Sequence, residues 1–108
     1  MDQAQLLASY TDAWEITQRM LEAARDEDWD GLLDLSQGRE QLFSQLMQAL
    51  PVAPENLQLA NETVALIRSI LAADQQTQSL SRDWMEEING VLTSVNVEKK
   101  LLKAYDPV

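Results

Sequence analysis

Apolar residues recur at steps of three and four over the first 25 residues of the chain. The series begins behind Asp2 and Gln5, which have the spacing of a capping box at a helix start. The pattern predicts an amphipathic helix over residues 3–25. Its apolar face consists of Leu6, Leu7, Tyr10, Ala13, Trp14, Met20, Leu21 and Ala24.

A second helical pattern follows the acidic run Asp26-Glu27-Asp28, whose carboxylates suit the N-terminus of a helix. This pattern stops before Pro51, because proline lacks an amide hydrogen and disfavours helical geometry in the preceding residue. We therefore expect a second helix over residues 29–49 and a short connection around Pro51 and Pro54. The expected inner face consists of Trp29, Leu32, Leu33, Ser36, Phe43, Leu46, Met47 and Leu50.

A heptad-like alternation of steps of four and three predicts a long third helix over residues 56–93. At 1.5 Å per residue it would measure about 57 Å, against about 32 Å for the second helix, so its far half should extend past its partners. Its core positions become polar near where the shorter helices should end. The series consists of Ala60, Val64, Ile67, Leu71, Asp74, Gln78, Ser81, Met85, Ile88, Leu92 and Val95.

The far half of the third helix carries an apolar stripe that the first two helices should leave uncovered. Helical spacing, a flexible methionine and an aromatic anchor are typical of a groove for a partner's amphipathic helix. Ordinary core packing and burial against a second copy of the chain remain open alternatives, so a homodimer is compatible with the pattern. The predicted partner-binding residues are Trp84, Met85, Ile88 and Leu92.

The C-terminal segment has its own apolar spacing and predicts a short helix over residues 97–105 after a break near residues 93–96. A helix of about nine residues is marginal in isolation, so we expect it to fold back reversibly over the stripe. Docking of this kind would regulate partner binding. The regulatory residues would be Val97, Leu101, Leu102 and Tyr105.

Together these patterns predict a single all-α domain over residues 1–108, an antiparallel bundle of three main helices with a short C-terminal helix folding back. The composition agrees, because 45% hydrophobic and 24% charged residues in a 108-residue chain are typical of one globular domain.

Charge and residue usage exclude several function classes. The formal net charge of −10 opposes binding to nucleic acid through phosphates. The chain contains neither cysteine nor histidine, which removes thiolate nucleophiles, imidazole bases and the usual zinc ligands. We therefore expect no enzyme activity, no catalytic residue, no metal and no cofactor. An acidic N-terminus and the lack of a long apolar run predict a cytoplasmic protein that does not bind membranes.

The segment Asp26-Glu27-Asp28-Trp29-Asp30-Gly31 matches the opening of a calcium-binding EF-hand loop. The twelfth position is Gln37, which cannot provide the bidentate carboxylate that completes the calcium shell. Helical periodicity also continues through the supposed loop. We therefore interpret these acids as the cap of the second helix.

The order of these features resembles the FliT family of flagellar type III export chaperones. The resemblance rests on an opening helix with the aromatic Trp14, on the Asp28-Trp29-Asp30 helix start, on a proline-containing turn, and on a long third helix. It also includes the segment Glu98-Lys99-Lys100-Leu101-Leu102-Lys103-Ala104-Tyr105 and covers nearly the whole chain.

The resemblance implies a cytoplasmic, non-enzymatic chaperone that binds the C-terminal part of the filament-cap protein and prevents its premature assembly. It further implies contacts with components of the export ATPase complex and, in some bacteria, with an activator of flagellar transcription. The terminal helix is inhibitory in the family, with Tyr105 in the place of the family's C-terminal tyrosine and Trp29 in that of its helix-two tryptophan. A helical adaptor for an amphipathic helix of an unrelated partner remains the alternative.

Overall fold

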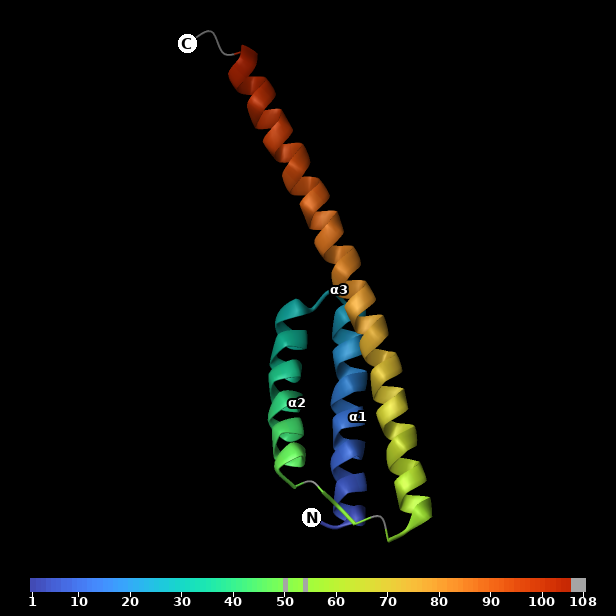
Figure 1. Cartoon of the computed structure of the whole chain (residues 1–108). Coiled ribbons are helices and arrows are strands. Elements are labelled where there is room, and N and C mark those ends of the chain that lie inside the picture. The colour runs from blue at the N-terminus through green and yellow to red at the C-terminus, as the bar shows by residue number, and fades with distance from the viewer. Residues whose placement is uncertain (50, 54, 106–108) are drawn as a thin grey trace.

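The computed structural model contains three helices, α1 (Gln3–Arg25), α2 (Trp29–Ala49) and α3 (Leu57–Tyr105), and no strand in the part of the chain that it describes (Figure 1). It describes the backbone of residues 1–49, 51–53 and 55–105, and the side chains of these residues up to 91. The predicted all-α helical bundle is confirmed. The first two helices also have the bounds that the hydrophobic pattern predicts.

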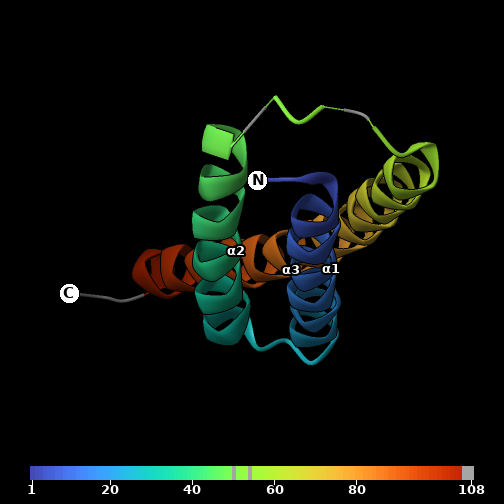
Figure 2. The same cartoon turned by 90° about the horizontal axis from the view of Figure 1, so that it is seen from below.

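The helices run up, down and up, so that α2 is antiparallel to both α1 and α3 (Figure 1). α1 packs against both of the other helices and lies between α2 and the start of α3 (Figure 2). α3 crosses α1 obliquely and continues far past the end of the bundle. The molecule is consequently a rod of 79 × 21 × 19 Å.

Side-chain caps fix the starts of α1 and α3 and join them to each other. Asp2 and Gln5 form the predicted capping box, with an amide-to-carboxylate hydrogen bond of 2.8 Å from Gln5 to Asp2. Asn56 caps α3 by accepting from the backbone N–H of Leu59 at 3.1 Å. The Gln3 side chain accepts from the Asn56 backbone N–H at 2.6 Å and donates to its carbonyl at 3.1 Å. α1 and α3 therefore begin at the same level.

The connection between α1 and α2 is a Schellman turn, in which two backbone amides return to the last turn of α1. The Glu27 N–H bonds the Ala24 carbonyl at 3.2 Å and the Asp28 N–H bonds the Ala23 carbonyl at 2.8 Å. Glu27 adopts a left-handed conformation with φ 57°, which glycine usually occupies in this turn. Asp28 then caps α2 by accepting from the Gly31 N–H at 3.0 Å.

The core between α1 and α3 is built largely from small side chains, which allow two helix backbones to approach closely. Three of its buried residues are threonines, and each hydroxyl donates to the carbonyl four residues earlier in its own helix. These bonds satisfy polar groups that would otherwise be costly to bury. The buried residues on α1 and α3 are Ala13, Thr17, Met20, Ala23, Ala24, Thr63, Ile70, Ala73 and Thr77, and α2 adds Leu46.

The inner faces of α2 and α3 differ from the predicted ones. Val64 and Leu71 of α3 are exposed, and Thr63 and Ile70 face α1 instead. The row that turns toward the bundle runs one residue earlier in each heptad. Thr63 and Val64, like Ile70 and Leu71, have similar volumes, so packing against α1 and not side-chain size or hydrophobicity decides which row is inside. On α2, Leu33 and Met47 are likewise exposed, although the pattern placed them inside.

The separate C-terminal helix of the sequence prediction is absent, and residues 97–105 continue α3 directly away from the bundle (Figure 1). The expected break near residues 93–96 does not occur. Thr93-Ser94-Val95-Asn96 contains neither proline nor glycine, so backbone hydrogen bonding can continue through it despite weak helix propensity. The side chains of Leu92, Val97, Leu101, Leu102 and Tyr105 lie outside the described residues.

The left-handed conformation of Glu27 gives a stability prediction. We expect Glu27→Gly to raise the free energy of unfolding by about 1 kcal/mol, because glycine removes the Cβ clash at this position. Urea unfolding followed by circular dichroism measures the change. Glu27→Gln is the control for the lost charge, since it keeps the Cβ atom. Equal effects of the two substitutions would show that charge repulsion, and not backbone strain, limits stability here.

Candidate functional site

The upper end of the bundle is where α3 separates from the other two helices. Arg25, the last residue of α1, donates to the Gln76 side chain of α3 at 3.3 Å. Trp29, the first residue of α2, packs on Trp84 of α3 with ring centroids 4.9 Å apart and a tilt of 41°. Residues 85–105 then continue for about 31 Å beyond this contact.

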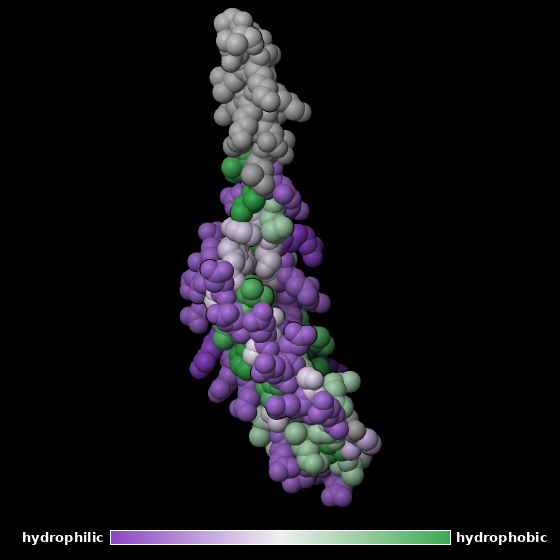
Figure 3. All heavy atoms as spheres, turned by 90° about the vertical axis from the view of Figure 1, so that its left-hand side faces the viewer, coloured by the Kyte–Doolittle hydropathy of each residue, from purple (hydrophilic) through white to green (hydrophobic). Residues whose placement is uncertain are grey.

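Apolar side chains continue on α3 above the tryptophan pair. Met85 is 52% exposed and Ile88 is half-buried, and Val91 is also exposed. Figure 3 shows the molecule from the α2 side. Hydrophobic side chains lie among polar ones along the bundle, and further hydrophobic side chains lie on α3 above the bundle. This part of α3 therefore presents apolar surface to solvent, as expected of a site that binds another chain.

A cleft of about 400 Å³ opens between α2 and α3 directly below the tryptophan pair. Met20 of α1 contributes from the buried core, and Leu32 and Leu33 form the apolar wall on α2. Leu33 is 56% exposed, so this wall is accessible from solvent. The full lining is Met20, Trp29, Leu32, Leu33, Ser36, Arg39, Asp74, Thr77 and Gln78.

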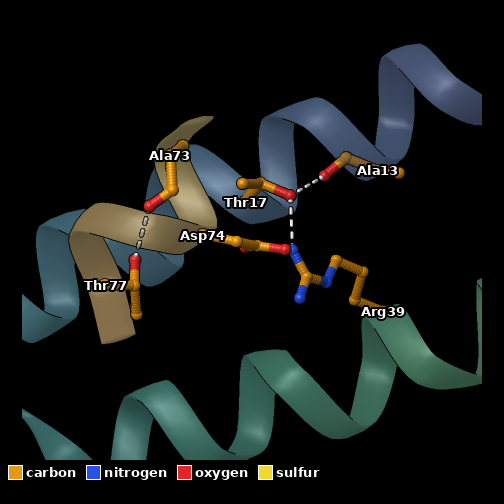
Figure 4. A network of polar contacts seen from close by, with 6 residues as sticks. All are labelled: Ala13, Thr17, Arg39, Ala73, Asp74 and Thr77. Atoms are coloured by element: carbon orange, nitrogen blue, oxygen red, sulfur yellow. Dashed lines mark hydrogen bonds and ion pairs between the residues drawn. The ribbon is translucent and has the colours of Figure 1, made fainter. Parts of the chain in front are cut away.

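Arg39 connects all three helices at the inner end of the cleft (Figure 4). Its Nη1 donates to the Thr17 hydroxyl of α1 at 2.8 Å and to the Asp74 carboxylate of α3 at 2.7 Å. Its guanidinium also lies 5.3 Å from the ring centroid of Phe43. With exposed side-chain fractions of 14% and 24%, Arg39 and Asp74 form a largely desolvated ion pair.

Trp29 contains the one buried side-chain donor without a partner in the described part of the chain, its indole Nε1–H. A buried N–H without an acceptor costs about 1–3 kcal/mol relative to one that is bonded or hydrated. The Trp29–Trp84 contact is therefore stabilised by apolar burial but weakened by this unsatisfied group. The upper edge of the cleft is the less stable part of the α2–α3 interface.

The acidic segment that resembles an EF-hand loop is not a loop, because α2 begins at Trp29 and contains residues 29–37. Asp28 is engaged as the cap of this helix, as the sequence interpretation proposed. Among the residues that the structure describes, no cluster of three or more acidic side chains is arranged to bind a metal ion. No described helix is long and apolar enough to cross a membrane.

The structure separates the four predicted partner-binding residues. Trp84 belongs to the upper end of the bundle, whereas Met85 and Ile88 lie above it on α3, and the side chain of Leu92 is outside the described residues. Sequence reasoning missed the cleft and the role of Arg39. Helical spacing places Ser36 and Arg39 in the inner row of Trp29 and Leu32, and Asp74 is the one acid in the predicted row of the third helix, but spacing alone does not show that Arg39 and Asp74 meet.

A comparison with models of protein families adds the decisive observation. The family model described as flagellar protein FliT matches residues 7–107. The chain belongs to the FliT family. It is therefore a flagellar chaperone with a helical-bundle fold. Comparisons with curated proteins and with solved structures gave no match.

The Arg39–Asp74 pair gives a prediction about the stability of this FliT-family bundle. Asp74→Ala leaves the desolvated guanidinium with only the Thr17 hydroxyl, and we expect the free energy of unfolding to fall by about 2 kcal/mol. The double variant Arg39→Met with Asp74→Leu should lose less than the single variant, because it leaves no unpaired charge. Chemical denaturation of both measures this. A loss under about 0.5 kcal/mol in Asp74→Ala would mean that the pair behaves as a surface ion pair.

Proposed function

We propose that this chain is a cytoplasmic export chaperone that binds the C-terminal segment of the flagellar filament-cap protein and delivers it to the export apparatus. Membership of the FliT family supports this function. The observation that carries it is the apolar surface of α3 beyond the bundle, where Met85 is 52% exposed and Ile88 half-buried. Such a surface suits an amphipathic helix of a partner, which would be shielded from assembly while bound.

Binding is tested by calorimetric titration with the C-terminal segment of the filament-cap protein from the same bacterium. We expect Met85→Asp to raise Kd about tenfold, because it places a charge in a desolvated contact. Leu71→Asp is a matched control, since Leu71 lies two heptads earlier on α3 and is also exposed. Equal loss in both variants would point to non-specific adhesion. No binding by any form would favour the adaptor with an unrelated partner.

We also propose that residues 97–105 regulate this surface when α3 bends. In the continuous α3 they extend away from the bundle (Figure 1), and Met85 is exposed. A bend would need helix disruption between Gly90 and residue 97. Gly90 is the weakest helix former of this stretch, and no atom lies within 4 Å of the place where its Cβ would be. An alanine there therefore fits.

This regulation predicts that two different changes strengthen partner binding. Deleting residues 94–108 removes the covering segment, and Gly90→Ala favours the straight helix by about 1 kcal/mol, so both should lower Kd, the second about fivefold. Gly38→Ala is the control, because Gly38 is also helical and open but lies within the bundle on α2. Unchanged affinity in both the deletion and Gly90→Ala would contradict an inhibitory role of the segment.

A further inference from the structure

The cleft between α2 and α3 and the apolar surface of α3 meet at the tryptophan pair. Trp84 contacts Trp29, which lines the cleft, and Ile88 lies one helical turn after Trp84 on the same face of α3. A ligand helix lying over Ile88 would therefore reach the tryptophan pair, and Leu33 lies in the same cleft as Trp29. A volume of about 400 Å³ accommodates a few side chains of such a helix.

A ligand would enter the cleft most easily by separating Trp29 from Trp84. The Trp29 indole N–H is buried without an acceptor among the described residues, so separating the two rings exposes a donor that is already unsatisfied. A ligand that offers a carbonyl or side-chain oxygen there would satisfy it. The new hydrogen bond would thus offset part of the free-energy cost of separating Trp29 from Trp84.

The surroundings of the cleft are strongly acidic. Residues 26–34 contain five carboxylates and no basic side chain, and all five are exposed. Residues 83–87 of α3 add three more exposed carboxylates. Of the arginines nearby, Arg39 is paired with Asp74 and Arg25 bonds Gln76, while Arg82 is exposed. The field at this end of the bundle therefore attracts cations.

From these observations we infer that the cleft lined by Trp29 and Leu33 is the second half of the partner-binding surface, and that it recognises an amphipathic helix with lysine or arginine flanking its apolar stripe. The apolar side chains would enter the cleft, and the basic flanks would face the carboxylates of residues 26–34 and 83–87. This inference rests on the proposed function, because it assigns the chemistry of the partner segment.

The test uses synthetic helical peptides about five turns long, titrated into the full-length protein. One peptide has leucines at helical spacing and lysines elsewhere, one replaces the lysines by glutamates, and one contains the leucines and lysines in scrambled order. We expect saturable binding of the first peptide alone, with a shift of the Trp29 indole N–H resonance, which the spectrum of Trp29→Phe assigns. Equal binding of the scrambled or the glutamate peptide would overturn the inference.

Two variants locate the binding. Leu33→Gln should raise Kd for the lysine peptide about tenfold, because Leu33 forms the accessible wall of the cleft. Met47→Gln is the matched control, since Met47 is 70% exposed at the opposite end of the same helix. Equal effects of the two substitutions would exclude the cleft as the site.

The filament-cap segment, titrated into the same variants, separates this inference from the proposed function. Binding that weakens in Met85→Asp but not in Leu33→Gln would refute the inference and leave the proposed function intact. A lysine peptide that depends on Leu33, together with no binding of the filament-cap segment, would refute the proposed partner and support the basic-helix specificity of the cleft.

Discussion

The length of α3 relative to its partners is the constraint on which the rest of the structure depends. α3 contains 49 residues, whereas α1 contains 23 and α2 contains 21. Because the bonds between Gln3 and Asn56 fix α1 and α3 to a common start, burial of α3 ends near Trp84. Of the described side chains beyond that residue, Met85 and Val91 are exposed, and they form apolar surface that another chain can bury.

Within the bundle, α1 and α3 approach closely through small residues, and this geometry leaves α2 to contact α3 mainly through long side chains. Arg39 and Trp29 provide these contacts, one by an ion pair with Asp74 and the other by packing on Trp84. The cleft is the space that remains between them. The Arg39–Asp74 ion pair stabilises the inner end of the cleft, whereas the unsatisfied indole N–H of Trp29 weakens its outer edge. When α2 and α3 move apart, the outer edge should therefore separate first.

This arrangement gives a small acidic bundle of the FliT family a surface that another chain can bury. The described residues provide an apolar surface with an acidic border, and the same long helix contains the surface and the segment proposed to regulate it. Bending of one helix would then change how much of the surface is available. The net charge of −10 opposes binding to nucleic acid through phosphates and agrees with the basic partner segment inferred for the cleft.

The sequence by itself determined α1 and α2 with their caps, because periodicity, proline positions and the acids Asp2 and Asp28 act over a few residues. It ended the third helix at residue 93 and expected a separate helix over 97–105, whereas α3 continues to Tyr105. It also predicted an α3 longer than its partners. Which face of α3 is inside depended on tertiary packing, since two neighbouring rows are both acceptable and only contact with α1 favours the row of Thr63 and Ile70. The cleft and the Arg39 bridge likewise required the structure, because they join residues from three helices that no local spacing relates.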